Sequence, residues 1–94
     1  MNTLEQKAHI YKSLGDETRL SIARKLAQAQ GEVRCSDIVS DCAAMLKLSQ
    51  PTMSYHFQTL VHAQVLIQRK EGVEKYYQLN HKVLAAAGID TAKL

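Results

Sequence analysis

The apolar residues of this 94-residue chain change their spacing near residue 64. Before that point they recur every three or four residues, which is the spacing of one face of a helix. After it, residues 65–69 and 74–79 form two short runs rich in β-branched and aromatic side chains, and Glu71-Gly72 between them is a turn signal. The chain is therefore expected to fold into helices followed by one β-hairpin.

Capping residues divide the helical part into segments. We expect helices over about 3–14, 16–30, from Ser36 or Asp37 to about 46, and 49–63, with a last short helix over about 81–87. Asp16, Ser49 and Asn80 are predicted N-caps, and Gly15 and Gly31 are predicted stops. The predicted buried stripes are Leu20, Ile22, Ala23, Leu26 and Ala27; Ile38, Val39, Cys42, Ala43 and Leu46; and Met53, Phe57, Leu60 and Val61.

Length and composition narrow the class of protein. We expect residues 1–94 to form a single domain, whose small core favours pairing with a second copy. The hydrophobic fraction of 46% excludes a disordered chain, and the scarcity of aromatic residues suits a mainly helical, aliphatic core. The net charge of +3 permits binding to nucleic acid without requiring it.

Several classes are excluded by missing signals. With two cysteines and no apolar leader segment, the chain is expected to be cytoplasmic, and no stretch is long enough to span a membrane. No pair of carboxylates, activated nucleophile or glycine-rich phosphate loop is recognisable, so we expect no enzymatic activity and no cofactor.

The segment 49–61, S-Q-P-T-M-S-Y-H-F-Q-T-L-V, follows a short helix and a tight turn, as in a helix-turn-helix. Its buried stripe leaves short polar or amide-bearing side chains facing outward, and residues 49–64 contain no Lys, Arg, Asp or Glu. Such groups can read base edges in a major groove. The candidate DNA-binding residues on this helix are Ser49, Gln50, Thr52, Ser54, Tyr55 and Gln58. The alternative interpretation is an ordinary amphipathic helix with a polar outer face.

The hairpin carries a second candidate surface. Arg69, Lys70 and Lys75 lie around its turn, where a wing could reach the flanking DNA backbone or minor groove. Glu71 and Glu74 dilute this basic character. The alternatives are a capping sheet with solvated charges, and a winged-helix module that binds protein rather than DNA.

Three strings in the chain resemble the ArsR/SmtB family. They are Leu14-Gly15-Asp16-Glu17-Thr18-Arg19-Leu20, the segment L-S-Q-P-T-M-S-Y-H-F over 48–57, and Lys75-Tyr76-Tyr77-Gln78-Leu79. The family's strings have the forms L-x-D-P-T-R-L, L-S-Q-P-T-V-S-H-H-L and V-Y-Y-x-L. The resemblance implies a mainly α winged helix-turn-helix (α-α-α-α-β-β-α), homodimeric through its first and last helices, that acts as a repressor released by an effector. It also implies base-facing roles for Gln50, Ser54 and Tyr55, with Tyr55 in place of the usual His.

Many members of that family carry a C-x-C metal motif at the third helix. In the matching stretch of this chain, Arg34 and Ser36 flank a single Cys35, and the last helix offers only His81 as a ligand. The spacing of the Cys and His residues along the chain does not bring four thiolate or imidazole ligands together. We therefore expect no dedicated metal site. A metal-responsive repressor with a non-standard site stays an alternative.

Cys35 and Cys42 are the remaining candidates for an effector response. On one helix they would lie about 10 Å apart, whereas a disulfide needs Cα atoms within about 7 Å. A disulfide would therefore require part of the third helix to unwind, and this would disturb the recognition helix at 49–63 that the third helix braces. The hypothesis is a thiol redox switch. The alternative is that Cys42 is a small core residue and Cys35 a loop thiol.

The expected partners are a second copy of the chain and double-stranded operator DNA with an inverted repeat. The dimer contact is expected to bury Leu4, Ala8, Tyr11, Val83 and Leu84. Arg19 is expected to form an ion pair with Asp16 or Glu17 rather than to contact phosphate, His56 to be half-buried, and His62 to lie on the surface. The segment 41–47 is about one turn longer than is usual in the family and forms either an extended third helix or a longer turn.

Overall fold

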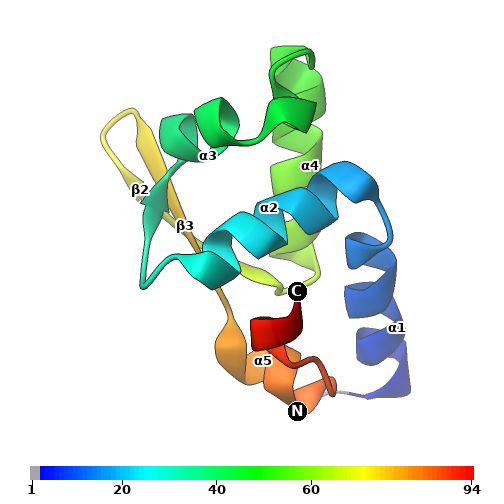
Figure 1. Cartoon of the computed structure of the whole chain (residues 1–94). Helices are drawn as coiled ribbons and strands as arrows, with labels where there is room; N and C mark the ends of the chain where they lie inside the picture. Colours follow the sequence, from blue (N-terminus) through cyan, green and yellow to red (C-terminus); the bar gives the residue numbers. More distant parts are fainter. Residues whose placement is uncertain (1–2) are drawn as a thin grey trace.

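The computed structural model describes residues 3–94. Its elements are α1 (Leu4–Leu14), α2 (Glu17–Gln28), β1 (Val33–Arg34), α3 (Cys35–Asp41), the 3-10 helix η1 (Ala43–Met45), α4 (Gln50–His62), β2 (Leu66–Glu71), β3 (Glu74–Leu79), α5 (His81–Ala86) and the 3-10 helix η2 (Thr91–Lys93). In Figure 1, α2 crosses in front of α4, α3 lies above α2 and beside the upper part of α4, and the hairpin and α1 lie on opposite sides. The predicted order of four helices, a hairpin and a final helix is confirmed.

Local capping signals set the helix starts. Oδ2 of Asp16 accepts a hydrogen bond from the Arg19 amide at 3.1 Å, Oγ of Ser49 accepts from the Thr52 amide at 3.3 Å, and Oδ1 of Asn80 accepts from the Val83 amide at 3.3 Å. Each cap satisfies a backbone donor that the helix itself leaves unpaired, and is typically worth about 1 kcal/mol. All three predicted N-caps are confirmed.

A short strand was not predicted. β1 pairs antiparallel with β3, with Val33 opposite Tyr77 and Arg34 opposite Tyr76, so that the sheet has three strands in the order β1-β3-β2. Two residues are too few for an alternating pattern, and only the neighbouring strand makes this segment extended. Because β1 runs directly into α3, that helix begins at Cys35 with Arg34 as an N-cap that makes no side-chain bond. The prediction of Ser36 or Asp37 as the cap was wrong.

The longer segment before α4 is a turn rather than an extension of the third helix. α3 ends at Asp41, and η1 carries the chain towards Ser49. Met45 is fully buried and anchors this turn, whereas Ala43 and Leu46 are exposed. The prediction that Ala43 and Leu46 are buried was wrong, because a 3-10 turn presents a different side of the chain from a continued α-helix.

The core lies where α2, α3, α4 and the sheet meet. Its largest fully buried side chains include Ile22, Leu26, Ile38, Met45, Leu60, Val65, Tyr77 and Leu84. The rings of Phe57 and Tyr77 stack with their centroids 4.5 Å apart and join α4 to β3. Within residues 3–94 no helix has the length and apolar character needed to cross a membrane.

The first helix buries little of its predicted stripe. Only Ile10 and Ser13 of α1 are buried, while Leu4 is 85% and Tyr11 51% exposed. The Tyr11 hydroxyl nevertheless donates a 2.7 Å hydrogen bond to the carbonyl of Ala87, just after α5. The two terminal helices are therefore fixed to one another and leave apolar side chains of α1 uncovered.

Candidate nucleic-acid interface

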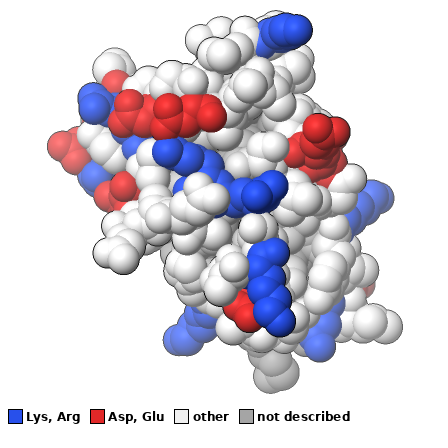
Figure 2. All heavy atoms as spheres, in the orientation of Figure 1, with Lys and Arg blue, Asp and Glu red and all other residues white. Residues whose placement is uncertain are grey.

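The beginning of α4 presents an uncharged polar surface. Gln50, Thr52, Ser54 and Tyr55 are all exposed, with Tyr55 at 63%. Ser49 and Thr52 hold the helix start, because their hydroxyls lie 2.9 Å apart and Ser49 also caps the Thr52 amide. Figure 2 shows this upper end of the molecule as mostly white, in contrast to the mixture of red and blue on the wing. The helix start thus offers hydroxyls and an amide and has no carboxylate of its own.

The other face of α4 is fixed to the body of the protein. Phe57 and Leu60 are buried, and His56 is half-buried, as predicted. The surface position predicted for His62 is also confirmed. Because one face of α4 is held by the core, its exposed polar face has a defined orientation.

Gln58 is less available than its neighbours on α4. It is half-buried, and its Nε2 donates a 3.3 Å hydrogen bond to Oε1 of Gln68 on β2. The same oxygen accepts a 3.0 Å hydrogen bond from the Tyr77 hydroxyl. Gln58 therefore connects α4 to β2, and the periodicity of α4 alone could not reveal this partner.

The pairing of β2 with β3 sorts the wing charges onto two faces. Lys70 lies opposite Lys75, two residues along from the pair of Gln68 and buried Tyr77, so that both lysines share the face of the buried tyrosine. Neither lysine forms an ion pair within residues 3–94. Like charges placed directly opposite one another oppose pairing of the strands, so this arrangement suits an anionic partner.

Arg69 lies on the other face of the hairpin, and two carboxylates of the protein already pair with its charge. Its Nε lies 3.0 and 2.9 Å from the two carboxylate oxygens of Glu32, its Nη1 pairs with Glu71, and its guanidinium lies 4.5 Å from the centre of the Tyr76 ring. Hydrogen bonds to Glu32 and Glu71 raise the pKa of Arg69, and Arg69 in turn lowers the pKa of Glu32. The guanidinium thus ties the wing to the segment before β1, and the predicted contact of Arg69 with DNA stays a prediction.

The side chains of the two cysteines line different hollows of the molecule. Cys35 is half-buried and lines a cavity with α4 and β3, whereas buried Cys42 lines a hollow with Ser21, Arg24, Lys25 and Gln28 of α2. Desolvation by burial raises the pKa of both thiols, although Lys75 partly offsets the effect at Cys35 and Lys25 at Cys42. Both thiols are therefore protonated at neutral pH, and the redox switch stays a hypothesis.

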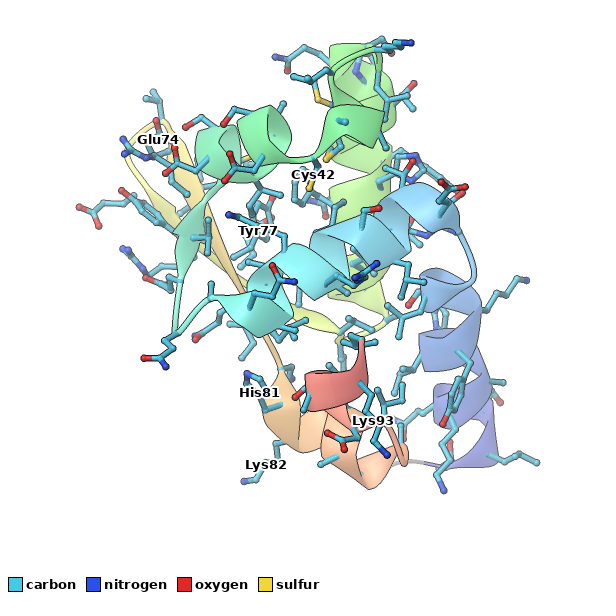
Figure 3. All side chains as sticks on the ribbon, in the orientation of Figure 1. Cys42, Glu74, Tyr77, His81, Lys82 and Lys93 are labelled. Carbon is cyan, nitrogen blue, oxygen red and sulfur yellow. The ribbon has the colours of Figure 1, made fainter. Side chains whose placement is uncertain are left out.

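Within the described part of the chain, His, Cys, Asp and Glu side chains form no group of three or more that could hold a metal ion. His81 lies at the start of α5, where its Nδ1 is 3.4 Å from the Thr91 hydroxyl, and Figure 3 shows it far from Cys42. The structure also places beside the candidate surface two residues that the sequence did not indicate as binding residues. Ser36 and Ser40 line the same cavity as Cys35 and the start of α4, and their polarity within α3 is the only signal for such a role.

A family model described as "Bacterial regulatory protein, arsR family" matches residues 16–66, which run from the N-cap of α2 to the first residue of β2. The chain belongs to this family. It is accordingly a transcriptional regulator with a winged helix-turn-helix domain, and the family resemblance stated from its sequence motifs is confirmed.

Two curated relatives and one solved structure illustrate the similarity. The ArsR-family chain is 37% identical over 73 residues to the uncharacterized HTH-type transcriptional regulator YceK of Bacillus subtilis, covering 78% of the chain and 69% of the relative. It is 37% identical over 75 residues to an arsenical resistance operon repressor of Staphylococcus aureus, covering 80% of the chain and 66% of the repressor. The chain thus spans about two thirds of the length of these relatives.

The solved structure is a solution structure from Mycobacterium bovis. It is described as a homodimeric winged helix-turn-helix DNA-binding domain and a possible ArsR-family transcriptional regulator. The two chains are 28% identical with a TM-score of 0.71, covering 90% of the regulator and 74% of the mycobacterial chain. The small three-stranded sheet and the helix order of the present structure therefore match a winged helix domain.

Proposed function

We propose that this regulator reads an operator with the exposed start of α4 in the major groove. The observation that carries the proposal is the stretch without charged residues at 49–64, whose polar side chains Gln50, Thr52, Ser54 and Tyr55 are exposed while its apolar side is buried. Amide and hydroxyl groups can donate to and accept from base edges, and a neighbouring carboxylate would repel the phosphates. Gln50, Ser54 and Tyr55 are the proposed base-reading residues, and Ser49 and Thr52 position the helix start.

The wing supplies the backbone contacts in this proposal. Lys70 and Lys75 lie on the same face of the hairpin as Tyr77, which stacks on Phe57 of α4. Because neither lysine is paired with a carboxylate within residues 3–94, both can pair with DNA phosphates. Arg69 and Gln58 act through structure, because their partners hold the wing against the segment before β1 and against α4.

The regulator is proposed to act as a homodimer through its terminal helices. Leu4, Ala8 and Tyr11 of α1 remain exposed, and half-buried Val83 of α5 belongs to the same proposed interface. Leu84, in contrast, has no exposed surface and belongs to the protomer's own core, so its predicted place in the interface was wrong. The homodimeric description of the Mycobacterium bovis domain supports this proposal. Two-fold symmetry then implies an operator with an inverted repeat.

Selection of bound fragments from a random DNA library tests this function. We expect enrichment of two half-sites in inverted orientation, with centres about 10–10.5 base pairs or a multiple of that distance apart. Gln50→Ala protein should select a less restricted sequence from the same library. A library that shows no enrichment, or an enriched site without a repeat, would contradict the proposal. A parallel selection with peroxide-treated protein tests the thiol hypothesis, because a redox switch requires loss of the selected site.

A further inference from the structure

A cavity of about 470 Å³ opens between α3, the first half of α4 and the wing. This volume is in the range of small-molecule sites, which typically measure about 300–1,000 Å³. Each of the three elements contributes walls to it, with Val39 from α3, Met53 and Phe57 from α4, and Tyr77 from β3. In Figure 3, Tyr77 lies in the interior between the sheet and the helices, and Glu74 lies at the outer end of the wing.

The walls of this cavity are mainly apolar, and so are two points on its rim. Leu46 is 64% exposed at the turn before α4, and Val73 is 97% exposed at the tip of the wing. Water around these side chains and around the wall residues would be released when an apolar molecule enters. An exposed apolar rim around a concave surface is typical of a ligand or partner site.

The charges of the lining residues indicate what kind of molecule fits. Lys75 and Glu74 are the cation and the anion among these residues, so the lining has no net charge, while Ser36, Ser40, Gln50 and Ser54 add groups that form hydrogen bonds. A charged ligand would lose its hydration without a surplus of opposite charge. We propose that this cavity binds a small, uncharged, largely apolar molecule with one polar group, and that the molecule competes with operator DNA.

The competition follows from shared residues, and this part rests on the proposed function. Gln50, Ser54 and Lys75 line the cavity and are also proposed DNA contacts. The DNA strand that runs from the major groove read by α4 to the phosphates bound by the wing must cross the space between these two elements. A molecule bound there would obstruct that strand. The cavity would then be an effector site that uses no metal ligands.

The binding step can be tested without DNA. The probe is 2-naphthalenemethanol, an uncharged two-ring alcohol, added to protein labelled with carbon-13 at the methionine methyl groups. Met53 lines the cavity, whereas fully buried Met45 does not, so we expect the probe to shift the Met53 resonance and to leave the Met45 resonance in place. The probe should also slow alkylation of Cys35 and leave the rate at Cys42 unchanged, because Cys42 opens towards α2. No shift at Met53, or equal protection of both thiols, would overturn the proposal.

Matched probes and variants sharpen the same test. The anion 2-naphthoate and the cation 2-naphthylmethylammonium have the same rings, and tighter binding of either would contradict an uncharged ligand. Ser40→Trp should fill the cavity and abolish the Met53 shift. Ser21→Trp is its control, since Ser21 is also a helical serine bonded to a carbonyl of the preceding turn but lines the hollow on α2. Equal loss of the shift in both variants would argue against this cavity.

Competition is measured last, with the selected operator. A strictly competing probe at twice its own dissociation constant should raise the operator Kd about threefold. An unchanged Kd despite the Met53 shift would overturn the regulatory part of the proposal and leave the binding site intact. Failure of the protein to bind any operator without the probe would instead contradict the proposed function.

Discussion

Nη1 of Arg19 lies 3.1 Å from Nδ1 of His56 and donates the hydrogen bond between them. A guanidinium has no acceptor, so Nδ1 must be the unprotonated nitrogen of the ring. Nε of the same arginine donates a 2.7 Å hydrogen bond to the carbonyl of Ser13 at the end of α1. One side chain on α2 therefore joins the proposed dimerisation helix to the recognition helix. The acidic partner expected from the sequence is not the one observed, since the Asp16 carboxylate accepts the backbone amide of Arg19 and lies 3.9 Å from Nδ1 of His56 rather than pairing with the guanidinium.

Loss of the Arg19 side chain should destabilise the fold. Arg19→Met leaves the Ser13 carbonyl and the His56 ring without their donor, which we expect to cost about 1–3 kcal/mol of unfolding free energy. Urea denaturation measures the change. Arg24→Met is the control, because Arg24 is an exposed arginine on the same helix and its replacement removes the same charge. Equal midpoints for the two variants would show that the bridge contributes nothing.

The two faces of the wing should respond differently to loss of a positive charge. Lys75→Gln should weaken binding to all DNA sequences by a similar factor and reduce the slope of log K against log salt by about 1. Arg69→Gln should leave that slope unchanged and instead speed hydrogen exchange in β2 and β3, because Arg69 is already paired with Glu32 and Glu71. Lys82→Gln, at the opposite end of the molecule from the wing tip in Figure 3, controls for net charge. A slope reduced by Arg69→Gln would place its guanidinium on the DNA.

Two glutamines of α4 should have separable effects on sequence preference. Gln50→Ala should lower discrimination at one base position of the operator by about 1–3 kcal/mol, the usual value of a good side-chain contact to a base. Gln58→Ala should keep the same preferred sequence, because its amide bonds to Gln68 on the wing. Competition binding against single-base operator variants measures both, and a changed base preference in Gln58→Ala protein would mean that this residue also reads DNA.

Substitutions at Leu4 and Leu84 should have separate effects on dimerisation and on the stability of the protomer. Leu4→Lys should shift the protein from dimer to monomer in sedimentation experiments with little loss of protomer stability, because Leu4 is 85% exposed. Leu84→Ala should instead cost about 2–5 kcal/mol of unfolding free energy, because it leaves a cavity in the protomer core. A Leu4→Lys protein that sediments unchanged would argue against a contact through α1.

The thiols should react slowly at neutral pH. Burial raises the pKa of both Cys35 and Cys42, so alkylation of the folded protein should lag behind that of the unfolded chain and accelerate only above the ordinary thiol range. The folded state binds the thiol protons more tightly than the unfolded state does. The contribution of the thiols to the free energy of unfolding is therefore fully present below the thiol pKa of the unfolded chain, and it is lost as the pH rises through the thiol pKa of the folded protein. Single Cys→Ser variants assign each rate. Rapid oxidation at pH 7 would favour the redox hypothesis over two inert thiols.

The sequence predicted the starts of α2, α4 and α5 well because their causes are local. The caps at Asp16, Ser49 and Asn80 depend on residues three positions away, and the α4 stripe depends on its own periodicity. β1 could not be predicted in this way, because a two-residue strand exists only through its pairing with Tyr76 and Tyr77. The turn at 42–48 depends likewise on the burial of Met45 rather than on any capping residue.

The chemistry of the candidate site shows the same division. An uncharged polar surface at the start of α4 was determined by the sequence, because no charged residue occurs over 49–64 and the helical period fixes which side chains face outward. Which of the polar and charged side chains are bound within the protein was decided only by the tertiary structure. Arg69 is bound by Glu32 and Arg19 by His56, each across 37 residues of chain, and Gln58 is bound by the wing. Such contacts depend on how distant elements pack together, and residue spacing along the chain carries no information about them.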